Sequence, residues 1–133
     1  LLNRIKKADK DAKDKAEKEN ISDVYFTGAR KDVEKIIPSA DVLVLPSFSE
    51  SFGLVLIEAL ASGKPVIGSD VGGIKEIITP EVGLLIDPNS PETIADAVDK
   101  IILDDEFRTN LASNARNRAK IFSKVEIPYD EVK

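Results

Sequence analysis

Four short apolar runs, separated by segments of helical periodicity, constrain the fold of this chain more than any other feature. The run DVLVLP at 41–46 is continuously apolar between its first and last residues, which is typical of a strand buried on both faces. Helical patterns lie between the runs, and strands that alternate with helices at this spacing predict a parallel sheet covered on both sides. We predict strands over 23–28, 41–46, 65–69 and 82–87.

The helical segments have recognisable ends. Pro38 and Gly63 each close a helix, and Ser90 is the expected N-cap of another, followed by Pro91 at the first helical position. In the first helix, acidic residues precede lysines by four positions, which predicts a solvated helix face. Helices are predicted over 1–19, 31–40, 53–62, 72–78, 90–103 and 104–122.

Composition narrows the classes of function. The 133 residues, 42% hydrophobic and 32% charged, fit one globular domain, and the net charge of −5 argues against a nucleic-acid partner. The chain has no Cys and no His, so thiolate catalysis and a histidine base are excluded within it. It has no Met, no signal peptide and no span-length apolar run, so we interpret Leu1 as internal to a longer cytoplasmic protein.

Two glutamates stand out near the middle of the chain. Glu58 interrupts the otherwise apolar segment from Gly53 to Ala61, and Glu50 lies eight residues earlier. A buried, unpaired carboxylate costs several kcal/mol, so Glu58 needs either partners or a function. Ligands of open parallel sheets bind beyond the carboxyl ends of the strands. The functional loops are therefore predicted at 27–31, 46–53, 69–73 and 87–90.

Two of these loops lead into helices at glycines. The first amides of a helix suit a phosphate or a sugar oxygen, and Gly53 would let a ligand approach them. The glycine pair Gly72–Gly73 repeats the pattern on the next strand. Glu58 shares a helix face with Leu54, so its carboxylate could accept hydrogen bonds from a ribose diol. Tight turns that need glycine, and an ion pair for Glu58, are the alternatives.

The segment PSFSESFGLVLIEALASGKPVIGSDVGGIKEII resembles the donor site of the retaining glycosyltransferases of GT-B fold, family four (glycosyl transferases group 1). The matching motif has two glutamates separated by seven residues around a Phe-Gly-Leu turn, followed by a Gly-Lys-Pro-Val-Ile strand and a Gly-Gly helix start. Flanking segments agree, and the resemblance covers roughly residues 21–122. It implies a Rossmann-like parallel sheet, the C-terminal half of a GT-B fold, here lacking its first two strands. The chain, 1–133, would be one partial domain.

The resemblance also implies roles for individual residues. Glu58 would hold the ribose hydroxyls of the sugar nucleotide, and Glu50, the implied catalytic residue, would meet the transferred sugar. Ser51 stands where the family often has Gly. The remaining implied donor contacts are the backbone of Phe52, Gly53 and Leu54 and the base-bordering residues Gly28, Ala29 and Arg30.

The implied reaction is transfer of a sugar from a nucleoside-diphosphate sugar to an acceptor hydroxyl, with retention and without metal or cofactor. The acceptor, a glycan, lipid or small molecule, would bind through a missing N-terminal domain, as would any peripheral membrane contact at the inner face of the membrane. The fragment alone would be inactive. Three alternatives stay open: a non-catalytic binding module, a GT-B sugar-nucleotide epimerase, and an α/β response domain. The last is disfavoured because Asp23 and Asp41 fall at strand starts.

Overall fold

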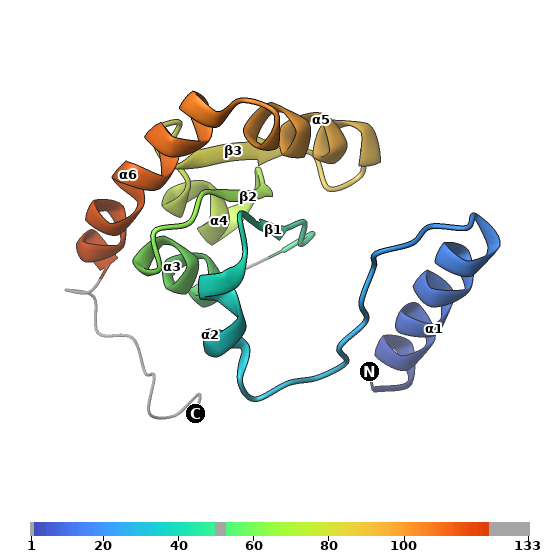
Figure 1. Ribbon diagram of the computed structural model, residues 1–133. Helices are drawn as coiled ribbons and strands as arrows, with labels where there is room; N and C mark the ends of the chain where they lie inside the picture. The colour runs from blue at the N-terminus through green and yellow to red at the C-terminus, as the bar shows by residue number, and fades with distance from the viewer. Residues whose placement is uncertain (1, 50–52, 123–133) are drawn as a thin grey trace. The chain divides into compact units, whose positions relative to one another are not determined.

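The computed structural model describes residues 2–49 and 53–122 (Figure 1). The helix prediction at the N-terminus is confirmed, and the helix predicted over 31–40 is a short α-helix followed by a 3-10 turn that contains Pro38. In chain order the elements are α1 (Leu2–Lys18), α2 (Val33–Ile36), η1 (Ile37–Ser39), β1 (Leu43–Leu45), α3 (Leu54–Ala61), β2 (Val66–Ser69), α4 (Gly72–Ile77), β3 (Gly83–Ile86), α5 (Pro91–Ile102) and α6 (Asp105–Phe122).

The three strands form one parallel sheet in the order β1-β2-β3, as the alternation of strands and helices predicts. Leu43 pairs with Val66, and Val66 pairs with Gly83. All four residues of β2 are buried, whereas those of β1 are half-buried. The prediction that the 41–46 run is buried on both faces is therefore wrong for β1, because that strand lies at the edge of the sheet.

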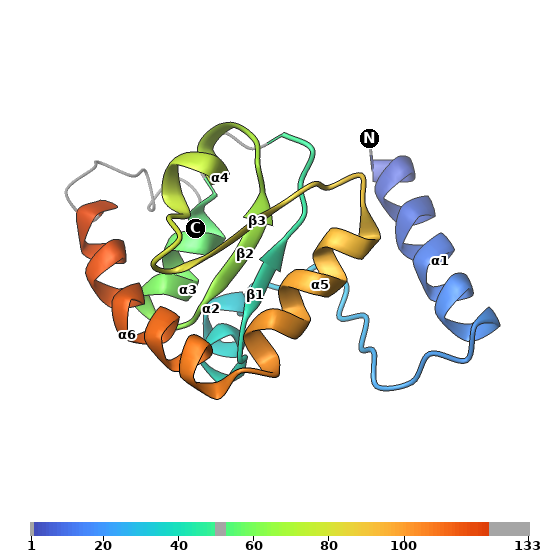
Figure 2. The same cartoon turned by 90° about the horizontal axis from the view of Figure 1, so that it is seen from above.

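The two faces of β2 build two cores. Val66 packs with residues of α3, α4 and the C-terminal part of α6, while Ile67 packs with β3, α5 and Leu111 of α6. Alternate residues of a strand point to opposite faces, so helices must cover both sides of the sheet. Figure 2 shows α3 and α4 on one side and α5 on the other. The α/β architecture predicted from the sequence is confirmed.

Two glycines let the layers approach closely. A Cβ on Gly68 would lie 2.6 Å from Ile74 Cγ2 of α4, and a Cβ on Gly83 would lie 1.9 Å from the carbonyl oxygen of Val66. The first contact brings α4 down onto β2, and the second permits the pairing of β2 with β3. These close approaches set the height of the α4 start above the sheet.

Residues 23–28 do not form a strand, so that prediction is wrong. A strand needs a hydrogen-bonded neighbour, and none of the strands in the described residues pairs with this segment. Its side chains are exposed, with Tyr25 84% accessible.

The chain divides into two compact units, Leu1–Val33 and Glu34–Lys133. The first contains α1, where Lys13 lies over the Phe26 ring at 5.9 Å, and the second contains the sheet. The interpretation of 1–133 as one partial domain stays a prediction.

We predict that Gly83→Ala destabilises the sheet severely. The added methyl group would overlap a backbone oxygen that no side-chain rotation can move, so β2 and β3 must separate. The loss should be about 3 kcal/mol or more, at or beyond the upper end of overpacking costs. The free energy of urea unfolding measures it.

Gly28→Ala is the matched control. Gly28 has φ +67° but no heavy atom within 4 Å of an added Cβ, so only backbone strain of about 1–2 kcal/mol is expected. Equal losses for the two variants would show that the Gly83 contact does not limit the sheet.

Candidate functional site

The carboxyl ends of the three strands meet at one edge of the sheet and are joined by hydrogen bonds. Ser69 Oγ at the end of β2 donates to the carbonyl oxygen of Leu45 at 3.5 Å, and the Asp70 amide donates to Ile86 at 3.0 Å. Ser69 is fully buried. The loops predicted at 46–53, 69–73 and 87–90 therefore start from a fixed edge, as expected for a ligand site in this class of sheet.

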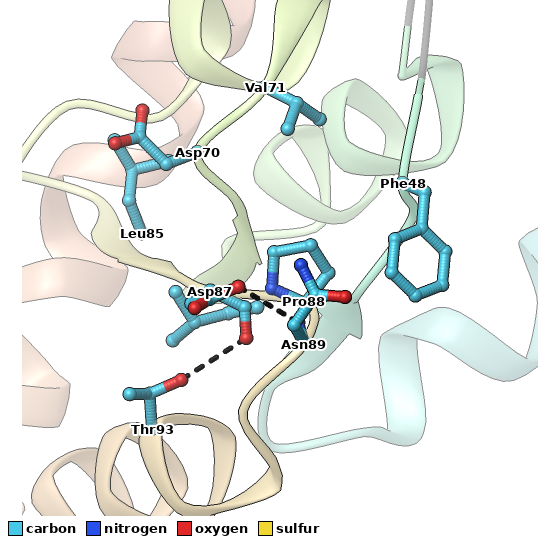
Figure 3. Close-up of a pocket in the computed structure, with 9 residues that line it drawn as sticks. Phe48, Asp70, Val71, Leu85, Asp87, Pro88, Asn89 and Thr93 are labelled. Carbon is cyan, nitrogen blue, oxygen red and sulfur yellow. Dashed lines mark hydrogen bonds between the residues drawn. The ribbon is translucent and has the colours of Figure 1, made fainter.

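A pocket of about 470 Å³ opens at this edge, between the loops that follow β1, β2 and β3 (Figure 3). The sequence located its loops but identified none of its side chains as site residues. The sequence feature that could have identified these side chains is their position just after the three strands. The lining residues are Phe48, Asp70, Val71, Leu85, Ile86, Asp87, Pro88, Asn89 and Thr93.

Gly53 precedes α3 in the left-handed conformation, with φ 62° and ψ 44°. It is buried, and an added Cβ would lie 3.2 Å from both Ile77 Cδ1 and Leu56 Cδ1. Glycine is therefore required by packing and by conformation, which supports the tight-turn alternative. A glycine N-cap also supplies no side-chain acceptor for the first amides of α3. The role of Gly53 in donor binding stays a prediction.

Glu58 is half-buried on α3, one turn after Leu54, which is also half-buried. Burial raises the pKa of its carboxyl, and the nearby charge of Glu34 adds to the shift. No lysine or arginine in the described part of the chain forms an ion pair with it. The ion-pair alternative therefore has no partner there, and the carboxylate is partly desolvated without compensation.

The other predicted donor residues lie outside the described part of the sheet unit. Glu50, Ser51 and Phe52 lie outside the described residues. Gly28, Ala29 and Arg30 belong to the first unit, where Arg30 Nε donates to Asp32 Oδ1 at 2.8 Å. The described site thus holds three of the predicted residues, Gly53, Leu54 and Glu58.

The helix start at the glycine pair lies where it was predicted. The helix α4 begins at Gly72, with φ 40°, and its N-cap residue Val71 makes no side-chain capping bond. At the other end, Arg118 of α6 donates to the carbonyl oxygens of Ile77 at 2.9 Å and Glu76 at 2.7 Å. These bonds anchor the C-terminal end of α4 to α6, and anion binding at its start stays a prediction.

The described residues contain no group of three or more acidic side chains placed to hold a metal ion. Transfer without a metal stays a prediction.

Among the residues that the structure describes, no helix is both long and apolar enough to cross a membrane.

Comparison with known families gives a match over most of the chain. The model of the family described as glycosyl transferases group 1 matches residues 6–118. The uncharacterized glycosyltransferase MJ1607 of Methanocaldococcus jannaschii is 46% identical over 85 residues, 63% of this chain and 22% of that protein. N-acetyl-alpha-D-glucosaminyl L-malate synthase of Bacillus anthracis is 36% identical over 117 residues, 82% of this chain and 31% of that protein.

Solved structures give the same result. Sucrose-phosphate synthase from Thermosynechococcus elongatus aligns with a TM-score of 0.78 and 32% identity, over 91% of this chain and 32% of that one. HepE (Alr3699) from Anabaena, in complex with UDP and glucose, aligns with a TM-score of 0.80 and 26% identity, over 91% of this chain and 34% of that one. The sheet and its helices match the C-terminal half of a GT-B fold. The chain spans between about a fifth and a third of the curated relatives named above.

We predict that Glu58→Gln stabilises the fold at neutral pH. A carboxyl whose pKa is raised by folding binds protons more tightly in the native state, so stability falls as the pH rises through its titration range. The free energy of unfolding of Glu58→Gln should exceed that of the unmodified chain by an amount that grows between about pH 4 and pH 7. Glutamate ordinarily titrates across this range. Urea unfolding at the two pH values measures it.

Glu34→Gln serves as the companion variant, because it removes only the weaker cause of the shift and should recover a smaller part of the advantage. A loss of stability at pH 7 in Glu58→Gln would indicate that a cation pairs with Glu58 after all.

Proposed function

Because this chain belongs to the glycosyl transferases group 1 family, we propose that it forms the donor-nucleotide half of a glycosyltransferase. The complete enzyme would transfer a sugar from a nucleoside-diphosphate sugar to an acceptor hydroxyl, with retention at the anomeric carbon. The observation that carries the proposal is Glu58 on α3, the helix after β1. It is a partly desolvated carboxylate without an ion pair in the described residues.

The geometry of α3 suits a nucleoside diphosphate. Glu58 lies five residues after Gly53, roughly 7.5 Å along the helix axis. Phosphate oxygens at the first amides of the helix and ribose hydroxyls at Glu58 would then occupy one face of α3. The cost of holding Glu58 partly buried would be offset by two hydrogen bonds from the ribose. The relative HepE was solved with UDP and with UDP-glucose, which supports a nucleotide of this class.

The remaining roles follow the resemblance. Glu50 would face the transferred sugar, and the backbone of Phe52, Gly53 and Leu54 would bind its hydroxyls and the distal phosphate. Ser51 would lie among these donor contacts, and Gly28, Ala29 and Arg30 would border the base. Helix-start amides and cationic side chains would stabilise the departing diphosphate, so no metal is required. The acceptor would bind mainly through another domain.

We extend the proposal to a hexosyltransferase in the cytoplasm, acting there or at the inner face of the membrane. The chain by itself would bind donor without completing transfer. The alternatives are a binding module and a sugar-nucleotide epimerase. Incubating the full-length enzyme with UDP-, GDP- and ADP-sugars and acceptor distinguishes them, because only a transferase releases nucleoside diphosphate in step with glycosylated acceptor.

We predict that Glu58→Gln weakens UDP binding to the full-length enzyme by about 1–3 kcal/mol, the value of a lost hydrogen bond to a charged group. Isothermal titration calorimetry measures the affinity, and Glu106→Gln, an exposed position on α6, is the matched control. Unchanged UDP affinity in a folded Glu58→Gln protein would remove the basis of the proposal.

A second prediction distinguishes the roles of Glu50 and Glu58. Departure of the diphosphate leaves positive charge on the sugar, so a carboxylate at Glu50 would act mainly in the transition state. Glu50→Gln should therefore lower kcat much more than it raises the dissociation constant of the donor. Steady-state turnover and donor titration on the same protein give both quantities. Equal, binding-only losses for Glu50→Gln and Glu58→Gln would make Glu50 a donor-positioning residue.

A further inference from the structure

The pocket at the sheet edge combines an exposed ring with polar groups. Phe48 is 70% exposed and lies in the loop after β1, while Asp70 and Leu85 stand on the opposite side of the pocket (Figure 3). Single exposed apolar side chains are common on protein surfaces and need no explanation. Phe48 differs because its ring borders a defined cavity, whose volume of about 470 Å³ falls within the range of small-molecule sites.

Hydrogen bonds within the loop after β3 and at the start of α5 hold the polar side of the pocket in place. The backbone amide of Asn89 donates to Asp87 Oδ1 at 2.9 Å. The one hydroxyl proton of Thr93 lies between the carbonyl oxygens of Ser90 at 2.9 Å and Asp87 at 3.2 Å. Ser90 caps α5 by accepting from the Thr93 amide at 3.3 Å. The loop after β3 is thereby tied to the start of α5. The Asp87 carboxylate is consequently oriented by the Asn89 backbone before any ligand arrives, which reduces the entropy lost on binding.

The charge of the lining selects among ligands. Among the described residues that line the pocket, Asp70 and Asp87 carry a charge, and none is a lysine or arginine. Two carboxylates and no cation repel a phosphate or carboxylate group. The carboxylates can accept hydrogen bonds from hydroxyls, and the side-chain amide of Asn89 can both donate and accept. A neutral, hydroxyl-rich ligand is therefore favoured over an anionic one.

We propose that this pocket binds a neutral sugar ring, with the C–H face of the ring against Phe48 and ring hydroxyls on Asp87 and Asn89. A sugar has an apolar face and a polar rim, as the pocket does, and the negative face of an aromatic ring attracts C–H groups. Val71, the N-cap residue of α4, lines the same pocket, so the sugar would sit beside the proposed donor site. Its assignment as an acceptor subsite rests on the proposed function, whereas sugar binding itself does not.

Protein-observed NMR on the 133-residue chain tests the proposal. The ¹⁵N-labelled chain is titrated separately with glucose, galactose, mannose and N-acetylglucosamine, and then with glucose 6-phosphate and glucosamine. At least one neutral sugar should shift the amides of Val71, Asn89 and Thr93, and glucose 6-phosphate should bind more weakly than glucose.

Variants at Phe48 separate stacking from simple apolar contact. Phe48→Leu should weaken binding about three- to tenfold, whereas Phe48→Tyr, which keeps the ring, should retain it. Because Phe48 is largely exposed, both variants should fold. Leu103→Ala removes another exposed apolar side chain, 80% accessible and outside the pocket, and should leave binding unchanged.

Four results would overturn the proposal: no shift with any neutral sugar, equal binding of glucose 6-phosphate and glucose, binding of glucosamine alone, or no effect of Phe48→Leu. A parallel titration with UDP keeps the two proposals apart, because UDP should shift the amides from Leu54 to Glu58. UDP binding without sugar binding would reject the sugar pocket and leave the donor site standing. Sugar binding without UDP binding would reject the donor site and leave the sugar pocket standing.

Discussion

The pairing of β2 with a parallel neighbour on each side is the constraint on which the rest of the structure depends. All four residues of β2 are buried, so their backbone groups must find partners within the sheet. Gly83 makes that possible on one side, since any side chain there would overlap the Val66 carbonyl oxygen. With the register set, the two faces of the strand direct helices to opposite sides, and the ends of all three strands share one edge.

The candidate site follows from that edge. The close approach at Gly68 places α4 directly on β2, and the left-handed Gly53 packs against Ile77 of the same helix. The start of α3 therefore packs against α4 where only a glycine fits, and α4 packs on β2 at a second such position. Pre-positioned helix-start amides would suit the proposed binding of a diphosphate, since donors that are already oriented need no reorganisation during a reaction.

Glu58, the proposed ribose-binding residue, weakens the fold that carries it. Its pKa is raised by burial and by the charge of Glu34, so ionisation is less favourable in the folded chain than in the unfolded one. A structural ion pair would shift it in the opposite direction. A partly desolvated carboxylate without a cation is a candidate functional group, because a hydroxyl-bearing ligand can supply the missing hydrogen bonds.

The sequence by itself determined the element order, the parallel sheet and the loops at its carboxyl edge, because periodicity, glycine stops and the cap at Ser90 act locally along the chain. It did not determine which apolar run becomes a strand: residues 23–28 have the composition of one but form none, because strand formation depends on a neighbour. The sequence also did not indicate the pocket lined by Phe48, Asp87 and Asn89. Phe48 lies in the loop after β1, whereas Asp87 and Asn89 lie in the loop after β3. Only the tertiary structure decided those features, since pairing and convergence depend on which segments the fold brings side by side.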